Sequence, residues 1–171
     1  EPCGNFAKET QDMGYTTYAE FWSRELADKI NTSHGKQDII FAANCMCHIP
    51  ELNDAFSAIE SLLSENGTFI FEDPSLAEVV NNNHVFSVIA LDNILKRSGL
   101  QITRVENLPV HGGSNRIFAG RIGSSIDETV EQNKAYERIL GLDRFETYQR
   151  LALRVEESKN DLVRLLTRCK E

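Results

Sequence analysis

The chain has 171 residues, and its 18 Lys plus Arg against 26 Asp plus Glu give a net charge of −8. This acidic balance argues against a broad nucleic-acid-binding face, which needs a basic surface, and no apolar run approaches the roughly 18 residues of a membrane-spanning helix. The four cysteines show no disulfide framework, so we expect a reduced, cytoplasmic protein of one domain, or of one domain with an appendage.

The first part of the chain predicts a helix, a short strand and a second helix. Residues 5–14 form a short helix, and residues 15–18 (YTTY) are rich in β-prone side chains. Residues 23–35 follow as a helix that Ser23 caps and a glycine ends.

A strand, helix and strand come next. Residues 37–47 are apolar without alternation, which is typical of a strand buried between helices. Residues 50–67 carry apolar side chains at helical spacing and end in Asn-Gly, and residues 68–74 form a second strand that Pro74 stops. Because such crossovers are right-handed, we expect the two strands to be parallel.

The remainder of the sheet ends in a hairpin. Residues 85–100 predict a helix with Ser87 as its cap, and residues 101–110 and 115–123 alternate like strands on either side of the turn HGGS. Two strands joined this closely pair as antiparallel neighbours. The element order predicts an α/β fold: a doubly wound, Rossmann-like sheet ending in an antiparallel hairpin.

The character of the sequence changes near residue 124. Two amphipathic helices follow, and the second carries a broken apolar stripe. We therefore expect a sheet domain over residues 1–123 and a helical arm over residues 124–171, which leads into a C-terminal subdomain or binds a partner.

The motif Cys45-Met46-Cys47-His48 raises the question of a metal or redox site. Structural zinc takes C-x2–4-C pairs with a second pair elsewhere, whereas the spacing here is C-x-C and the remaining Cys and His residues are isolated. A C-x-x-C redox motif is also absent. We predict no metal site and assign both cysteines to packing.

Polar residues gather where the predicted strands end. In open α/β sheets, ligands bind beyond the carboxyl ends of the strands. The residues expected at that edge are Glu1, Glu20, Phe21, Asn44 to His48, Glu72 and Asp73.

Four stretches of the chain resemble one known family. They are EPCGNFA (1–7), DIIFAANCMCHIPELND (38–54), GTFIFEDP (67–74) and LPVHGGSNRIFAG (108–120). They resemble class I S-adenosylmethionine-dependent methyltransferases, specifically the sugar C-methyltransferases that act on nucleotide-linked keto-deoxysugars. The H-I-P and V-H-G-G-S motifs are fairly specific to that family, and the resemblance covers nearly the whole chain.

The resemblance also implies that the chain is a fragment. The family has a zinc-binding domain and a glycine-rich loop before EP, and its C-terminal domain continues beyond Glu171. It also carries an aromatic segment ending in Y-x-E-H, where this chain runs from Asn83 directly into His84. We therefore expect missing residues at both ends and between Asn83 and His84.

For the cofactor, S-adenosylmethionine, the resemblance implies four binding residues. Glu1 would accept hydrogen bonds from the ribose hydroxyls, Phe21 would pack on adenine, Glu20 would accept from its amino group, and Asn44 would line the methionine side. The alternatives are a terminal surface Glu, a core Phe beside a surface Glu, and an ordinary Asn at a strand end.

For the nucleotide-sugar substrate, the resemblance implies a histidine base that removes a proton next to the ketone, so that the enolate carbon attacks the sulfonium methyl. His48, His84 and His111 are the catalytic candidates. The substrate-binding candidates are Glu72, Gly112, Gly113 and Ser114. Of these, Glu72 either faces the sugar or bonds only to backbone. HGGS is also explained as a tight turn that needs glycine.

Three alternatives remain open from sequence. The chain is a methyltransferase of another small molecule, a non-catalytic binding or structural module, or a nicotinamide-dependent Rossmann protein, although the G-x-G-x-x-G motif of the last is absent. Oligomeric state is not predicted.

Overall fold

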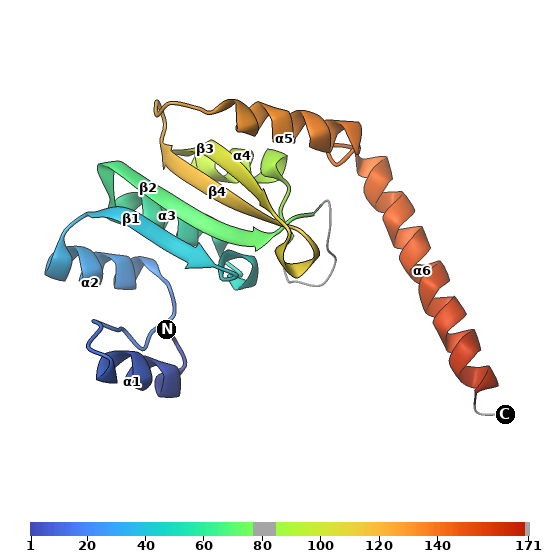
Figure 1. Ribbon diagram of the computed structural model, residues 1–171, viewed down its shortest axis with the longest axis horizontal. Coiled ribbons are helices and arrows are strands. Elements are labelled where there is room, and N and C mark those ends of the chain that lie inside the picture. The colour runs from blue at the N-terminus through green and yellow to red at the C-terminus, as the bar shows by residue number, and fades with distance from the viewer. Residues whose placement is uncertain (77–84, 170–171) are drawn as a thin grey trace.

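The computed structural model describes residues 1–76 and 85–169 of the chain. Its elements, in chain order (Figure 1), are α1 (Gly4–Asp12), α2 (Arg24–His34), β1 (Gln37–Ala43), the 3-10 helix η1 (Met46–His48), α3 (Leu52–Leu62), β2 (Leu63–Pro74), α4 (Val88–Arg97), β3 (Leu100–Leu108), the 3-10 helix η2 (Val110–Gly112), β4 (Ser114–Arg121), α5 (Glu128–Ile139) and α6 (Phe145–Arg168).

The strands form one sheet in the order β1-β2-β4-β3. β1 and β2 are parallel, whereas β4 runs antiparallel to both β2 and β3. The parallel crossover and the antiparallel hairpin predicted from sequence are therefore confirmed. The carboxyl ends of β1, β2 and β3 all lie at the edge of the sheet where β4 begins.

The hydrophobic core lies between one face of this sheet and the helices (Figure 1). Phe69 and Phe71 of β2 both point to that face and pack on Phe56 of α3. Their ring centroids lie 6.3 Å and 6.0 Å, respectively, from the ring centroid of Phe56. Ile39 and Phe41 of β1 point to the opposite face and are 67% and 58% exposed. The prediction that this apolar run is buried between helices was therefore wrong: among the described residues, β1 has one half-buried face and one exposed face.

Serine caps set the starts of two helices, as predicted. The hydroxyl of Ser23 accepts from the N–H of Leu26 at 3.2 Å, and that of Ser87 accepts from the N–H of Ala90 at 3.1 Å. Each cap satisfies an N–H group that the first helical turn leaves unpaired.

Two further local predictions were wrong. Residues 15–18 are not a strand, and the helix expected over residues 50–67 ends at Leu62. Leu63 is fully buried and pairs with Gln37, so tertiary packing continues the chain as strand. Gly67 is needed for close approach rather than to end a helix, because an added Cβ would lie 2.9 Å from the carbonyl oxygen of Gln37.

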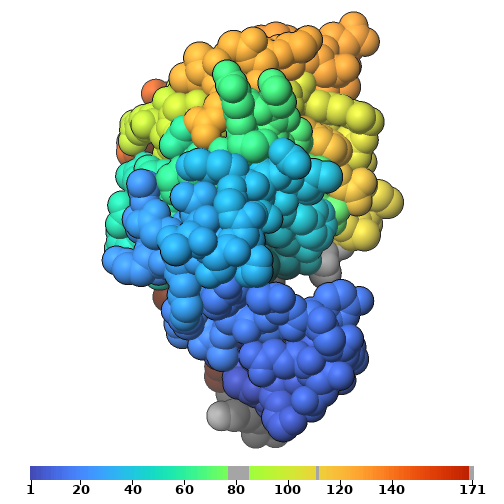
Figure 2. All heavy atoms as spheres, turned by 90° about the vertical axis from the view of Figure 1, so that its left-hand side faces the viewer, coloured from blue at the N-terminus to red at the C-terminus, as the bar shows by residue number. Residues whose placement is uncertain are grey.

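The two ends of the chain extend from the sheet. In the space-filling view of Figure 2, the dark blue N-terminal segment with α1 forms a lobe below the light blue and green segments. α5 packs on β3 and α4, and its Val130 is buried in the core. α6 has no buried residue and runs away from the sheet in Figure 1, so its apolar stripe is exposed. The boundary predicted between residues 123 and 124 stays a prediction.

Candidate functional site at the carboxyl edge of the sheet

Asn44 turns the chain sharply at the end of β1. Its φ of 51° lies in the left-handed region, which asparagine tolerates better than most residues. Its N–H donates to the carbonyl oxygen of Glu72 at 2.7 Å, so the ends of β1 and β2 are joined at this point. The turn leads directly into η1 and places His48 at the carboxyl edge, as expected.

Asp73 holds η1 from the end of β2. Its side chain is only 3% exposed, and its Oδ1 accepts from the N–H of Cys47 at 3.3 Å. Burial raises the pKa of this carboxyl, against the lowering effect of its hydrogen bonds with Cys47 and the charge of His48. Among the described residues, the buried Oδ2 of Asp73 has no hydrogen-bond partner.

The two cysteines of the motif differ. Cys47 is buried, and burial together with the hydrogen bond to Asp73 raises the pKa of its thiol to about 12. The thiol therefore stays protonated and acts as a packing group, as predicted. Cys45 is exposed, and its Sγ donates to the carbonyl oxygen of Ala43 at 3.1 Å. In residues 1–76 and 85–169, no three His, Cys, Asp or Glu side chains gather as a metal site would require.

Glu72 takes part in an ion-pair network on the face that exposes Phe41. Arg116 of β4 donates from Nε to Glu72 at 2.5 Å and from one terminal nitrogen to Glu106 of β3 at 3.1 Å. The Glu72 carboxylate, followed by Glu106, raises the pKa of Arg116. Sequence reasoning missed Arg116 and Glu106, because only the insertion of β4 between β2 and β3 brings the three together.

The HGGS segment forms the tight turn predicted for it. Gly112 and Gly113 have φ angles of 80° and 125°, which side-chain-bearing residues rarely adopt. The carbonyl oxygen of Gly113 accepts from the N–H of Ser75 at 3.1 Å, and the Ser114 hydroxyl donates to the carbonyl oxygen of Val110 at 3.1 Å. The turn, with the backbone of His111 in η2, is thus joined to the end of β2. His84 lies outside the described residues.

The predicted adenine and ribose contacts lie on exposed loops. Glu1 accepts from the N–H of Cys3 at 2.9 Å, which lowers the pKa of its carboxyl, and it lies close enough to Cys45 to influence that thiol. Glu20 pairs with Lys29 at 2.5 Å, and Phe21 is 80% exposed. A loop, not a strand, precedes them.

Trp22 is the aromatic residue of this loop that enters the core. Its side chain packs against the hydrophobic clusters, and its indole N–H donates to the carbonyl oxygen of Ala55 at 3.1 Å. Phe21, its neighbour, therefore faces outward. The sequence alone did not distinguish the two, because both are aromatic and neither lies in a periodic segment.

A cavity of about 300 Å³ opens between the HGGS turn, the carboxyl end of β3 and α5. Gly113 and Ser114 line it as the predicted substrate-binding residues, but most of its polar groups were not anticipated. These are the side-chain amides of Asn107, Asn115, Gln132 and Asn133, together with the ring of Tyr136. They come from β3, β4 and α5, so no local sequence motif signals them.

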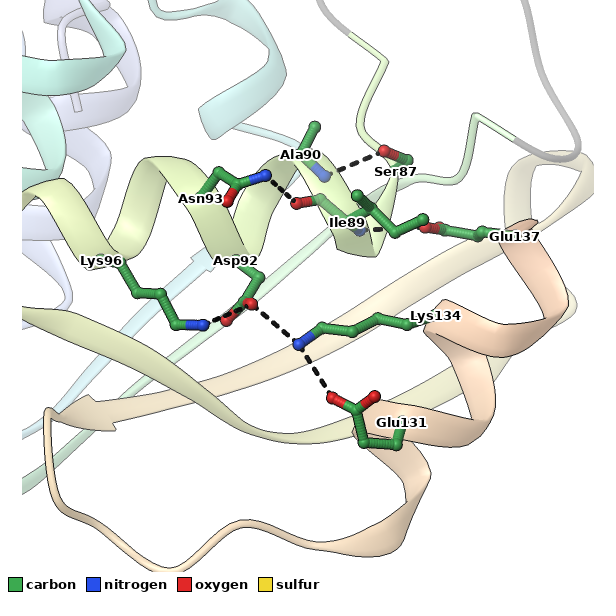
Figure 3. A network of polar contacts seen from close by, with 9 residues as sticks. All are labelled: Ser87, Ile89, Ala90, Asp92, Asn93, Lys96, Glu131, Lys134 and Glu137. Carbon is green, nitrogen blue, oxygen red and sulfur yellow. Dashed lines mark hydrogen bonds and ion pairs between the residues drawn. The ribbon is translucent and has the colours of Figure 1, made fainter. Parts of the chain in front are cut away.

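A polar network joins α5 to α4 beside this cavity (Figure 3). Lys134 is 8% exposed and donates to Asp92 at 2.8 Å and to Glu131 at 3.1 Å. Burial alone would raise the pKa of Asp92, but hydrogen bonds from Lys134 and Lys96 outweigh it and lower that pKa. This buried pair fixes the side of α5 that faces α4.

Glu137 completes the contact at the start of α4. It is 3% exposed, and its two carboxylate oxygens accept from the N–H groups of Val88 at 2.6 Å and Ile89 at 2.9 Å. Burial raises the pKa of this carboxyl, although both hydrogen bonds act in the opposite direction. A residue of the helical arm therefore supplies partners that the first turn of α4 lacks.

Comparison with known proteins shows two similarities in sequence. Residues 109–171 match the family described as the C-methyltransferase C-terminal domain. The C-methyltransferase NovU of Streptomyces niveus is 28% identical over 179 residues, a match that covers 96% of this chain and 43% of that protein. The chain thus spans less than half the length of this curated relative.

A solved structure shares the fold at low sequence identity. A S-adenosylmethionine-dependent methyltransferase from Clostridium acetobutylicum is 12% identical with a TM-score of 0.50, and the match covers 68% of this chain and 69% of that one. Magnesium protoporphyrin IX methyltransferase from Synechocystis is 18% identical with a TM-score of 0.45, over 67% and 51% of the two chains. No helix among the described residues has the length and apolarity that crossing a bilayer demands. The chain therefore has a Rossmann-like fold, which it shares with the methyltransferase from Clostridium acetobutylicum, and its sequence is similar to C-methyltransferase NovU and, over residues 109–171, to the C-methyltransferase C-terminal domain.

Proposed function

We propose that the protein transfers the methyl group of S-adenosylmethionine to a carbon next to a ketone on a nucleotide-linked deoxysugar. The observation that carries the proposal is the similarity to C-methyltransferase NovU, which extends over 96% of the chain and includes both the NCMCHIP and the HGGS segments. The fold supports it, because open α/β sheets bind ligands at the carboxyl edge where these segments lie.

The cofactor would occupy the side of this edge near β1. Asn44 stands at the end of β1 in a left-handed conformation, and Glu1 lies near the same strand end. The residues fit a cofactor with hydroxyl and amino groups, because a carboxylate and an amide both accept hydrogen bonds there. S-adenosylmethionine would supply an electrophilic methyl on a positively charged sulfur.

Histidine chemistry would generate the nucleophile. His48 ends η1 with an exposed side chain, held through the Cys47 to Asp73 hydrogen bond. Imidazole accepts protons near neutral pH, so His48 can take the proton from the carbon next to the ketone. The resulting enolate carbon forms a bond to the methyl as the carbon–sulfur bond breaks, and S-adenosylhomocysteine leaves. His111 and His84 remain further candidates for proton transfer.

The HGGS turn would stabilise the enolate oxygen. Its backbone lies at the carboxyl edge and is joined to the end of β2, because the carbonyl oxygen of Gly113 accepts from the N–H of Ser75. The N–H of Gly113 donates to the carbonyl oxygen of Val110, so the donors to the enolate would be other N–H groups of the turn. Preorganised donors of this kind stabilise charge that develops in a transition state. Glu72 accepts a hydrogen bond from Arg116. It would therefore orient that arginine at the carboxyl edge of the sheet instead of contacting the sugar by itself.

The test is a His48→Asn variant of the full-length gene product, with His34→Asn as the matched control. His34 lies at the end of α2, where its ring is hydrogen bonded to the Tyr18 hydroxyl at 3.2 Å. We expect His48→Asn to reduce methyl transfer from labelled S-adenosylmethionine at least about 100-fold, as loss of a general base does. Cofactor binding by calorimetry should be unchanged, and the control should retain full turnover. Undiminished turnover in His48→Asn would exclude His48 as the base.

A further inference from the structure

The cavity beside α5 contains a chain of three asparagines whose orientation is fixed at one end. Asn133 donates from Nδ2 to the carbonyl oxygen of Thr129 at 2.9 Å, and a backbone carbonyl can only accept. The Oδ1 of Asn133 therefore faces Asn107, which must present its Nδ2, at 2.9 Å. The same Nδ2 donates to the Oδ1 of Asn115, also at 2.9 Å.

This order leaves two polar atoms at the cavity unused. The Oδ1 of Asn107 accepts no hydrogen bond, and the Nδ2 of Asn115 donates none, within residues 1–76 and 85–169. Asn115 is 5% exposed, so its amide is held in place. The cavity thus offers one acceptor and one donor on neighbouring side chains, joined by a hydrogen bond between them.

The rest of the lining selects for an uncharged, flat group. Neither Lys nor Arg is among the described residues that line the cavity, which disfavours a phosphate. The one carboxylate of the lining, Glu137, already accepts from Val88 and Ile89 with its two oxygens. The ring of Tyr136 is 52% exposed at the same cavity and is available for stacking.

We propose that this cavity binds the pyrimidine base of a nucleotide-linked substrate. The ring N–H of a thymine or uracil would donate to the Oδ1 of Asn107, the adjacent ring carbonyl would accept from the Nδ2 of Asn115, and Tyr136 would stack on the ring. Asn and Gln side chains read the edge of adenine through one acceptor and one donor, and here two neighbouring asparagines would supply the acceptor and the donor. The inference rests on the proposed function, because it assigns one end of the same substrate.

The test compares three probes on the unaltered protein by calorimetry and by NMR of the asparagine side-chain amides. Thymidine should bind and shift the amide signals of Asn107 and Asn115. 3-Methylthymidine, which lacks the ring N–H, should bind at least about tenfold more weakly, the effect of one good hydrogen bond. The methyl glycoside of a deoxyhexose tests for a sugar in the same cavity and should not shift these signals.

Asn115→Asp is the variant to combine with these probes. It keeps the oxygen that accepts from Asn107 but removes the donor, so thymidine affinity should fall at least about tenfold. Asn160→Asp, on the exposed surface of α6, introduces the same charge and should leave binding unchanged. Equal binding of thymidine and 3-methylthymidine, binding of the glycoside in place of thymidine, or no thymidine binding would each overturn the proposal.

The outcome separates this inference from the proposed function. Methyl transfer to a nucleotide-sugar by a protein that binds no thymidine would refute the base site alone. Thymidine binding in the cavity of a protein without methyl transfer would refute the activity and leave the base site standing.

Discussion

Glu137→Ala tests whether α5 is part of the folded core or only rests on it. The change removes the two charge-assisted hydrogen bonds to Val88 and Ile89 and leaves both N–H groups of α4 without their partner. Each such bond is worth about 1.5–3 kcal/mol. Part of that gain is offset in the native protein, because burying the Glu137 carboxylate is itself unfavourable, as its raised pKa indicates. We expect a net loss of about 3 kcal/mol in the free energy of unfolding.

The assay is urea denaturation, supported by thermal melting. For a chain of this size, a loss of about 3 kcal/mol corresponds to a melting temperature lower by roughly 6–12 °C. Glu131→Ala is the matched control from the same helix, because its side chain is 68% exposed and pairs with Lys134 only at the surface. It should cost less than about 1 kcal/mol. Equal effects of the two substitutions would refute the reasoning, since they would mean that the start of α4 finds its partners elsewhere.

Two further substitutions test the edge and the core. Because burial raises the pKa of Asp73, its contribution to stability is greatest below the ordinary carboxyl pKa and is lost as pH rises through the raised value. Between acid and neutral pH, the Asp73→Asn variant should therefore lose less stability than the unaltered protein. Thermal melts of both proteins across that pH range test this. Parallel curves of melting temperature against pH would contradict it. Phe56→Ala, at a fully buried site, should cost about 3–5 kcal/mol in urea unfolding. Phe145→Ala, at a position 71% exposed, should cost less than about 0.5 kcal/mol, and similar losses would argue against this core.

Local signals accounted for much of the fold in advance. Ser23 and Ser87 each start a helix because a hydroxyl at that position satisfies an N–H of the first turn. The HGGS turn was predictable because it requires positive φ, which the structure confirms at Gly112 and Gly113. In each case the sequence within a few residues determines the structure, so no knowledge of distant contacts was needed.

Features that depend on distant contacts were not predictable in the same way. Residues 15–18 have strand-prone side chains but no neighbouring strand to pair with in the described sheet, and strand propensity depends strongly on such context. Leu63 to Gly67 look like a helix end, yet the segment belongs to β2, because Leu63 pairs with Gln37 and Thr68 pairs with Ile39 on either side of an irregularity in the register. The cavity amides come from positions 107, 115 and 133: Asn107 and Asn115 meet through the register of the β3–β4 hairpin, and Asn133 joins them because α5 packs on β3.

The position of β4 also relates the two proposed parts of the site. His48 and Asp73 stand at the ends of β1 and β2, and the asparagine chain stands at β3 and β4 in the same sheet. With strands about 4.8 Å apart, the two groups are separated by roughly two strand spacings, about 10 Å along the edge. A single ring could not reach both groups, whereas a nucleotide-sugar has a base and a sugar at opposite ends. The separation therefore favours an extended substrate, and Ser75, which is bonded to Gly113 and lines the cavity, lies on the path between its ends.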